Sequence, residues 1–217
     1  MRTILYLIRH SLKFDNSKII DYKTSESKII RSEKIVLSVE GERRAKILSK
    51  CNELKSMDKV YCSNCVRTLE TAKYLLEEQD LNVIIDERLD EKRVGIYNEK
   101  EYPNWFNLQY EDENYKTING ESQKEVRERM NECIDEILLN NRGKRIAIFS
   151  HGYAITFFLL KYARLDNLTS DRVYTYSFNG KKFLDDKLEA PMIFKLTFED
   201  DKIVDIENIK IDFDEVL

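Results

Sequence analysis

The sequence predicts an α/β fold, a three-layer sandwich in which helices cover both faces of a mainly parallel central sheet and the chain ends in hairpin-like strands. Three observations predict it. Short apolar runs alternate along the chain with segments of helical periodicity. The runs are continuous rather than alternating, as expected of parallel strands that are buried on both faces. Near the C-terminus, two strand-like segments flank a polar turn.

Composition limits the class of protein and its partners. The chain has 217 residues, enough for one well-filled core, so we expect a single domain over residues 1–217. Its 42% apolar and 35% charged residues are typical of a water-soluble globular protein, and 6 Gly and 2 Pro leave little room for linkers. A net charge of −4 gives no reason to expect nucleic acid or an anionic membrane as partner.

No apolar run has the length of a membrane span or of a signal-peptide core, the first ten residues included. The sequence therefore predicts a cytoplasmic protein. It leaves open whether the protein is a monomer or a homodimer.

The elements follow from the periodicity. We expect strands over 3–8, 59–63, 81–85 and 145–150, and helices starting at Ser38 and over 66–78, 122–140 and 153–162. Ser122 and Glu125 have the spacing of a capping box. The tail, with strands over 192–198 and 203–211, predicts a hairpin.

Two segments have no clear hydrophobic periodicity. Residues 15–34 are polar and predict a long surface loop. Residues 88–119 are irregular and carry Trp105, Phe106 and several tyrosines between acidic residues. These aromatic side chains fit either a substrate-binding wall or an ordinary core.

The chain has two histidines, His10 and His151, and each lies where an apolar strand ends. Ligands of open α/β sheets bind at the carboxyl ends of the strands, so the two rings are predicted at the functional edge. A buried structural role is the commoner fate of a lone histidine, and periodicity alone does not choose between the two.

Four cysteines occur, and Cys62 and Cys65 form a C-x-x-C pair. This spacing is compatible with a redox motif or with half of a zinc site. No second ligand pair completes a zinc site, so we favour reduced, buried or half-buried thiols.

Short motifs occur in a fixed order. They are Arg9-His10-Ser11, Leu37-Ser38-Val39-Glu40-Gly41, Ser63-Asn64-Cys65-Val66-Arg67 with Thr71-Ala72, Leu89-Asp90-Glu91, Gly120-Glu121-Ser122 and Ser150-His151-Gly152. From residue 3 to about 160, this set resembles the histidine phosphatase superfamily, the phosphoglycerate-mutase-like proteins whose first motif is Arg-His-Gly.

The resemblance implies catalysis through a phosphohistidine. His10 would be the nucleophile, Arg9 and Arg67 would bind the phosphoryl oxygens, and His151 would donate a further hydrogen bond to them. Arg suits this role because its planar fork binds two oxygens at once. The resemblance implies no metal and no cofactor, and a small-molecule phosphomonoester as substrate.

A carboxyl group must protonate the leaving oxygen and later activate water. By the resemblance this general acid and base is Glu91, and Asp90 or Glu121 is the next candidate. Asn16 matches a phosphate-contacting Asn of the family, although the residues between it and His10 do not match.

Ser11 replaces the usual Gly of the first motif, which is expected to alter rate or substrate fit rather than abolish activity. The acidic, aromatic stretch 102–116 favours a phosphomonoesterase that takes an apolar or sugar-like substrate. A phosphoglycerate-mutase-type phosphotransferase and a non-catalytic phosphate-binding regulatory protein stay open as alternatives.

Overall fold

The computed structural model describes residues 1–14, 32–96, 100 and 102–214. Its larger sheet has six strands, in the order β3 (Val83–Ile85), β2 (Lys59–Cys62), β4 (Arg145–Ser150), β1 (Arg2–Arg9), β8 (Met192–Glu199) and β9 (Lys202–Ile209). The first four of these strands are parallel, and β8 and β9 are antiparallel to their neighbours. The mainly parallel sheet is as predicted.

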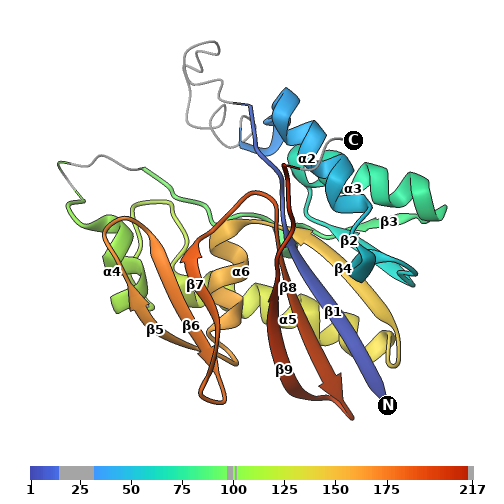
Figure 1. The fold of residues 1–217 in the computed structure, drawn as a ribbon. Helices are drawn as coiled ribbons and strands as arrows, with labels where there is room; N and C mark the ends of the chain where they lie inside the picture. The colour runs from blue at the N-terminus through green and yellow to red at the C-terminus, as the bar shows by residue number, and fades with distance from the viewer. Residues whose placement is uncertain (15–31, 97–99, 101, 215–217) are drawn as a thin grey trace.

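Side chains of the central strands alternate between two cores, because successive residues of a strand point to opposite faces. On β1, Leu5 and Leu7 pack with helices α5 (Gln123–Asn140) and α6 (Gly152–Leu159). Tyr6 and Ile8 pack against the other face, with α2 (Val39–Ser49) and α3 (Val66–Gln79). Figure 1 shows α2 and α3 on one side of the sheet and α5 and α6 on the other, which confirms the three-layer fold.

The predicted helix starts are confirmed. The Ser38 side chain accepts a hydrogen bond from the Gly41 amide and begins α2. Ser122 and Glu125 form the complete capping box at the start of α5. Helix α6 ends at Leu159, three residues before the predicted end at 162, because the amides of residues 160–162 bond to carbonyls three residues back and tighten the last turn.

The terminal hairpin is also confirmed, as β8 and β9, and it extends the large sheet beside β1. Asp200 and Asp201 connect the strands with φ values of 46° and 66°. Two left-handed residues are what a two-residue hairpin turn of matching twist requires.

A second sheet, which the sequence did not predict, consists of β5 (Arg164–Leu168), β6 (Val173–Phe178) and β7 (Lys181–Lys187). It lies beside α6, and the Tyr176 hydroxyl donates to the Thr156 carbonyl of that helix at 3.1 Å. The irregular segment 88–119 contains the short helix α4 (Trp105–Glu111). Two 3-10 turns complete the elements, η1 (Asn52–Leu54) and η2 (Glu87–Leu89).

The predicted surface loop over 15–34 lies outside the described residues except for its last three positions. In the ranges that the structure describes, no helix combines the length and the apolar character needed to span a membrane.

Candidate active site

His10 and His151 lie together at the carboxyl edge of the large sheet. They follow β1 and β4, which pair in parallel with Arg9 opposite Ser150. The His10 amide donates to the Ser150 carbonyl at 3.0 Å. The two ring centroids are 5.2 Å apart, and the residues are 6% and 0% exposed. Parallel pairing of the two predicted strands is therefore what brings the histidines together.

The His10 ring is held as one tautomer. Its Nδ1 lies 2.7 Å from the Ser11 carbonyl oxygen, which can only accept, so Nδ1 carries the proton and Nε2 keeps a lone pair. Burial, together with the charges of Arg67 and Arg9, holds the pKa of His10 well below its ordinary value of 6.5. At neutral pH the ring is consequently neutral, with Nε2 available as a nucleophile.

His151 uses both ring nitrogens within the protein. Its Nδ1 accepts from the Arg67 guanidinium at 2.8 Å, and its Nε2 lies 2.7 Å from the Ser63 hydroxyl. Because a guanidinium only donates, Nδ1 is the acceptor and Nε2–H donates to Ser63. Burial, followed by the charge of Arg67, holds the pKa of His151 well below 6.5. His151 is therefore a neutral, oriented ring.

A chain of hydroxyls supports this tautomer. The Ser63 Oγ lies 2.9 Å from the Thr68 Oγ1, which donates to the Cys65 carbonyl at 2.6 Å. The hydroxyl proton of Thr68 is used in this bond, so the Ser63 hydroxyl donates to Thr68 Oγ1. The Ser63 Oγ then accepts the hydrogen bond from His151 Nε2–H. The sequence predicted no role for Ser63 or Thr68, although Ser63 is the first residue of the Ser63-Asn64-Cys65-Val66-Arg67 motif.

Arg9 and Arg67 lie close enough to the His10 ring for their charges to lower its pKa. The Arg9 Nη1 donates to the carbonyls of Leu188 and Glu189, and Arg67 Nη1 donates to the Ser32 carbonyl. The Nε–H groups of both arginines are buried and have no hydrogen-bond partner among the described residues. A buried donor without a partner costs about 1–3 kcal/mol. Two of them on charged groups beside a neutral nucleophile suit the binding of an oxyanion.

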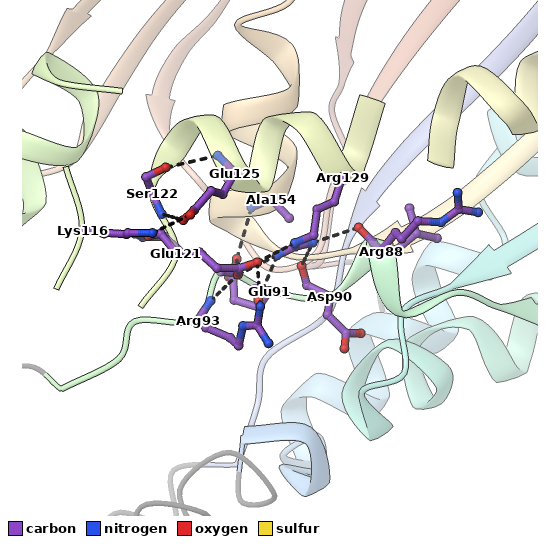
Figure 2. Close-up of polar contacts among 12 residues, drawn as sticks. Arg88, Asp90, Glu91, Arg93, Lys116, Glu121, Ser122, Glu125, Arg129 and Ala154 are labelled. Atoms are coloured by element: carbon purple, nitrogen blue, oxygen red, sulfur yellow. Dashed lines mark hydrogen bonds and ion pairs between the residues drawn. The ribbon is translucent and has the colours of Figure 1, made fainter. Parts of the chain in front are cut away.

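Glu91 lies at the start of the helix that follows His151. Its carboxylate accepts from the Ala154 amide of α6 at 3.1 Å (Figure 2). It also accepts from the Lys92 amide at 2.9 Å. It is also close enough to Arg9 to oppose the effect of burial, which lowers the pKa of that guanidinium. The structure therefore brings Glu91, Arg9 and His151 to the same edge.

The two alternative carboxyl groups have other partners. Asp90 accepts from the Asn64 amide at 2.7 Å, and burial raises its pKa above the ordinary value. Glu121 is paired with Arg129 at 2.9 Å. Burial acts to raise the pKa of Glu121, but hydrogen bonds from Arg129 and Arg93 hold it below the ordinary value. A proton donor needs a raised pKa, so Asp90 fits that role better than Glu121 does.

Ser11 has a fully buried side chain that is bonded to helix α2. Its hydroxyl donates to the Gly41 carbonyl at 2.8 Å, and its amide donates to Thr71 Oγ1 at 2.9 Å. Ser11 does not have a positive φ, so this position does not require glycine. Asn16, which the resemblance implies as a phosphate contact, lies outside the described residues.

The cysteines are free thiols, three of them buried and Cys51 half-buried. Burial raises the pKa values of Cys62 and Cys65, which makes both thiols unreactive. Ligand atoms of Cys65, Asp90 and His151 lie within 4.8 Å of one another. Of these three residues, His151 already uses both ring nitrogens within the protein, and Asp90 accepts from the Asn64 amide through Oδ1.

The aromatic segment packs beside the site. Trp105 is 8% exposed and meets Tyr153 of α6 edge to face, with ring centroids 5.9 Å apart. Phe106 contacts Tyr110 and Tyr174. These side chains therefore belong to the core, and Tyr153 is the one in the first turn of α6, next to Glu91.

Comparisons with known proteins show the family of this chain. The sequence profile of the histidine phosphatase superfamily (branch 1) matches residues 5–179. A probable phosphoglycerate mutase, GpmB, from Serratia proteamaculans (strain 568) is 28% identical over 127 residues, which are 55% of this chain and 59% of that protein. The matched region is thus less than two thirds of that relative.

Solved structures share the fold. YhfR from Bacillus stearothermophilus superimposes with a TM-score of 0.68 and 18% identity, covering 99% of this chain and 98% of that one. A mycobacterial glucosyl-3-phosphoglycerate phosphatase gives a TM-score of 0.63 and 17% identity, covering 96% and 97%. The profile match confirms the family that the sequence motifs indicated. The chain belongs to the histidine phosphatase superfamily, branch 1.

Proposed function

We propose that this protein hydrolyses small phosphomonoesters through a phosphohistidine on His10, without a metal ion. One observation carries the proposal. A neutral His10, held through Nδ1 by the Ser11 carbonyl, lies near Arg9 and Arg67, whose buried Nε–H groups have no partner in the described residues. A nucleophile beside preorganised donors for an oxyanion is the arrangement that phosphoryl transfer requires.

In the first step, His10 Nε2 attacks phosphorus. The Nε2–P bond forms, the P–O bond to the leaving group breaks, and Glu91 gives its proton to the leaving oxygen. Charge that spreads over the phosphoryl oxygens is met by Arg9 and Arg67. The positive charge that develops on the ring is stabilised by the bond from Nδ1 to the Ser11 carbonyl.

In the second step, water attacks the phosphohistidine. The new O–P bond forms, the Nε2–P bond breaks, and the Glu91 carboxylate takes the proton of the water. The products are an alcohol and inorganic phosphate, and Glu91 returns to its protonated form for the next cycle.

For His151 we propose two roles in sequence. With Nδ1 bound to Arg67, it holds that guanidinium beside His10. Donation from His151 to a phosphoryl oxygen, as the resemblance implies, requires its Nε2–H to leave Ser63. The Ser63 hydroxyl therefore competes with the substrate for this proton.

A mutase is the second candidate, because the curated relative is a probable phosphoglycerate mutase. A mutase must retain a highly anionic bisphosphate, which calls for extra basic side chains next to the site. Two basic residues near this segment are already paired, since Lys116 binds Glu125 and Arg127 binds Glu113. This pairing, with the acidic character of 102–116, favours hydrolysis of an ester with an apolar or sugar-like body.

The test is a panel of aryl, sugar and glycerate phosphates, assayed with a chelator present. The proposal expects release of inorganic phosphate and its loss in His10→Ala. Phosphoryl exchange between glycerate phosphates that outruns hydrolysis would establish the mutase instead. Tight binding of phosphate or vanadate with no turnover on the panel would establish a non-catalytic binding protein.

A further inference from the structure

Arg129 of helix α5 reaches across to the loop that carries Glu91 (Figure 2). Its Nη1 donates to the carbonyls of Arg88 and Asp90, both at 2.8 Å. Its Nη2 donates to the Glu91 carbonyl at 3.3 Å and to Glu121 Oε2 at 3.0 Å, and its Nε donates to Glu121 Oε1 at 2.9 Å. A guanidinium has five N–H groups, so every one of them is used.

Glu121 completes the contact from the end of the preceding loop. Its Oε2 also accepts from the Arg93 amide at 2.8 Å, and its own amide donates to the Arg93 carbonyl at 2.8 Å. The Lys92 ammonium donates to the Glu121 carbonyl. Together, Arg129 and Glu121 bind the backbone on both sides of Glu91.

This pair is shielded from water, since the side chains of Arg129 and Glu121 are 19% and 8% exposed. The five hydrogen bonds that Arg129 donates are therefore stronger and more directional than those of a surface ion pair. On the opposite side, the Glu91 carboxylate meets the Ala154 amide of α6. Glu91 is thus held through its backbone by α5 and through its carboxylate by α6.

We propose that Arg129 is the positioning residue for the general acid and base, and this inference rests on the proposed role of Glu91. Arg129 does not touch the phosphoryl group; it acts through the backbone of residues 88–91. A group that transfers a proton must be held within a fraction of an ångström, and a misplacement of about 1 Å can cost about 10²-fold in rate. Lysine cannot replace Arg129, because an ammonium has three donors and no planar fork.

The test uses Arg129→Lys, with Arg127→Lys as matched control on the same helix. Arg127 binds Gln123 and Glu113, and it forms no hydrogen bond or ion pair with residues 88–93. For each variant, kcat/KM is measured over phosphate esters whose leaving groups range from nitrophenol to simple alcohols. Good leaving groups need no proton, whereas poor ones do.

We expect Arg129→Lys to lower kcat/KM by about 10²-fold for alkyl esters and far less for the nitrophenyl ester. Glu91→Gln should have the same dependence on the leaving group. In the double variant, Arg129→Lys should add little to the loss already caused by Glu91→Gln, because both changes remove one proton transfer. In Arg127→Lys, the dependence of kcat/KM on the leaving group should be the same as in the unaltered protein.

A purely structural role is distinguished by this dependence. Loss of folded protein, followed by thermal denaturation, lowers kcat/KM by one factor for all esters, and that result for Arg129→Lys would overturn the proposal. If Glu91→Gln itself leaves the dependence on the leaving group unchanged, the proposed role of Glu91 is wrong and the positioning role falls with it. If Glu91→Gln steepens the dependence and Arg129→Lys does not, only the positioning role is wrong.

Discussion

The Glu91 carboxylate accepts a hydrogen bond from the Ala154 amide at 3.1 Å, in the first turn of the helix that His151 begins. The loop after β3 and the helix after β4 therefore meet at one point. Because β2, β4 and β1 are neighbours, this contact brings the predicted proton donor to the edge that carries His10. Sheet order, rather than sequence distance, assembles the site.

Glu91→Gln tests this arrangement through the second step of the reaction. With 4-nitrophenyl phosphate, the first step needs no proton, but hydrolysis of the phosphohistidine still needs a base. We expect steady-state turnover to fall by about 10²–10⁴-fold, preceded by a burst of one nitrophenol per site, measured by stopped flow. Asp90→Asn is the comparison. A burst in Asp90→Asn and none in Glu91→Gln would assign the role to Asp90.

Ser11→Gly tests what the serine contributes at the position where the family usually has glycine. The Ser11 hydroxyl donates to the Gly41 carbonyl of α2, and replacing Ser11 with glycine or alanine removes this buried hydrogen bond. We expect the free energy of unfolding in urea to fall by about 0.5–1.5 kcal/mol, with little change in kcat/KM. Ser11→Ala should show the same loss. A large gain in kcat/KM with unchanged stability would mean that the serine restricts the phosphate site.

Gly41→Ala tests the close contact between α2 and the segment after His10. A Cβ at this position would lie 2.0 Å from the Leu12 carbonyl oxygen, so the backbone must shift. We expect a loss of about 1–3 kcal/mol in the free energy of unfolding. The matched control is Gly152→Ala, whose Cβ would first meet Arg9 Nε at an ordinary 3.5 Å. Equal stability of the two variants would contradict the packing described here.

The two histidines predict how stability depends on pH. Their pKa values are depressed in the folded state, so below about pH 6.5 the unfolded chain binds protons that the folded chain does not. Stability is therefore fully present above about pH 6.5 and falls as the pH is lowered, by about 1.4 kcal/mol per pH unit for each histidine.

Urea denaturation between about pH 7.5 and 5.5, above the range of unfolded carboxyl groups, measures this slope. His10→Gln should halve it, since the chain has two histidines in all. A flat profile over this range would mean that the rings are protonated in the folded protein.

The sequence predicted the strands that carry His10 and His151 because both are unbroken apolar runs, which have few alternatives to a buried strand. It also predicted the Ser38 and Ser122 caps, which depend on local spacing alone. The sequence did not predict the sheet β5–β7. Strand β6 is buried over nearly its whole length and β7 is mostly exposed, so neither strand alternates between buried and exposed residues. Asn179-Gly180, with φ values of 49° and 78°, was the available hairpin signal.

The contacts around Glu91 were beyond prediction from one sequence. Arg129 binds carbonyls of residues about 40 positions away, and nothing in the local pattern distinguishes it from a surface arginine. Backbone carbonyls carry no side-chain signature, so their partners emerge only with tertiary structure. The same is true of Leu188 and Glu189, which bind Arg9.

The most direct test of the account is to trap the phosphorylated protein. After mixing with a phosphomonoester and quenching in alkali, in which phosphohistidine survives, intact-protein and peptide mass spectrometry locate the phosphoryl group. The account predicts one phosphoryl group on the peptide that contains His10, and none in His10→Ala. A phosphoryl group on another residue, or full turnover in His10→Ala, would contradict it.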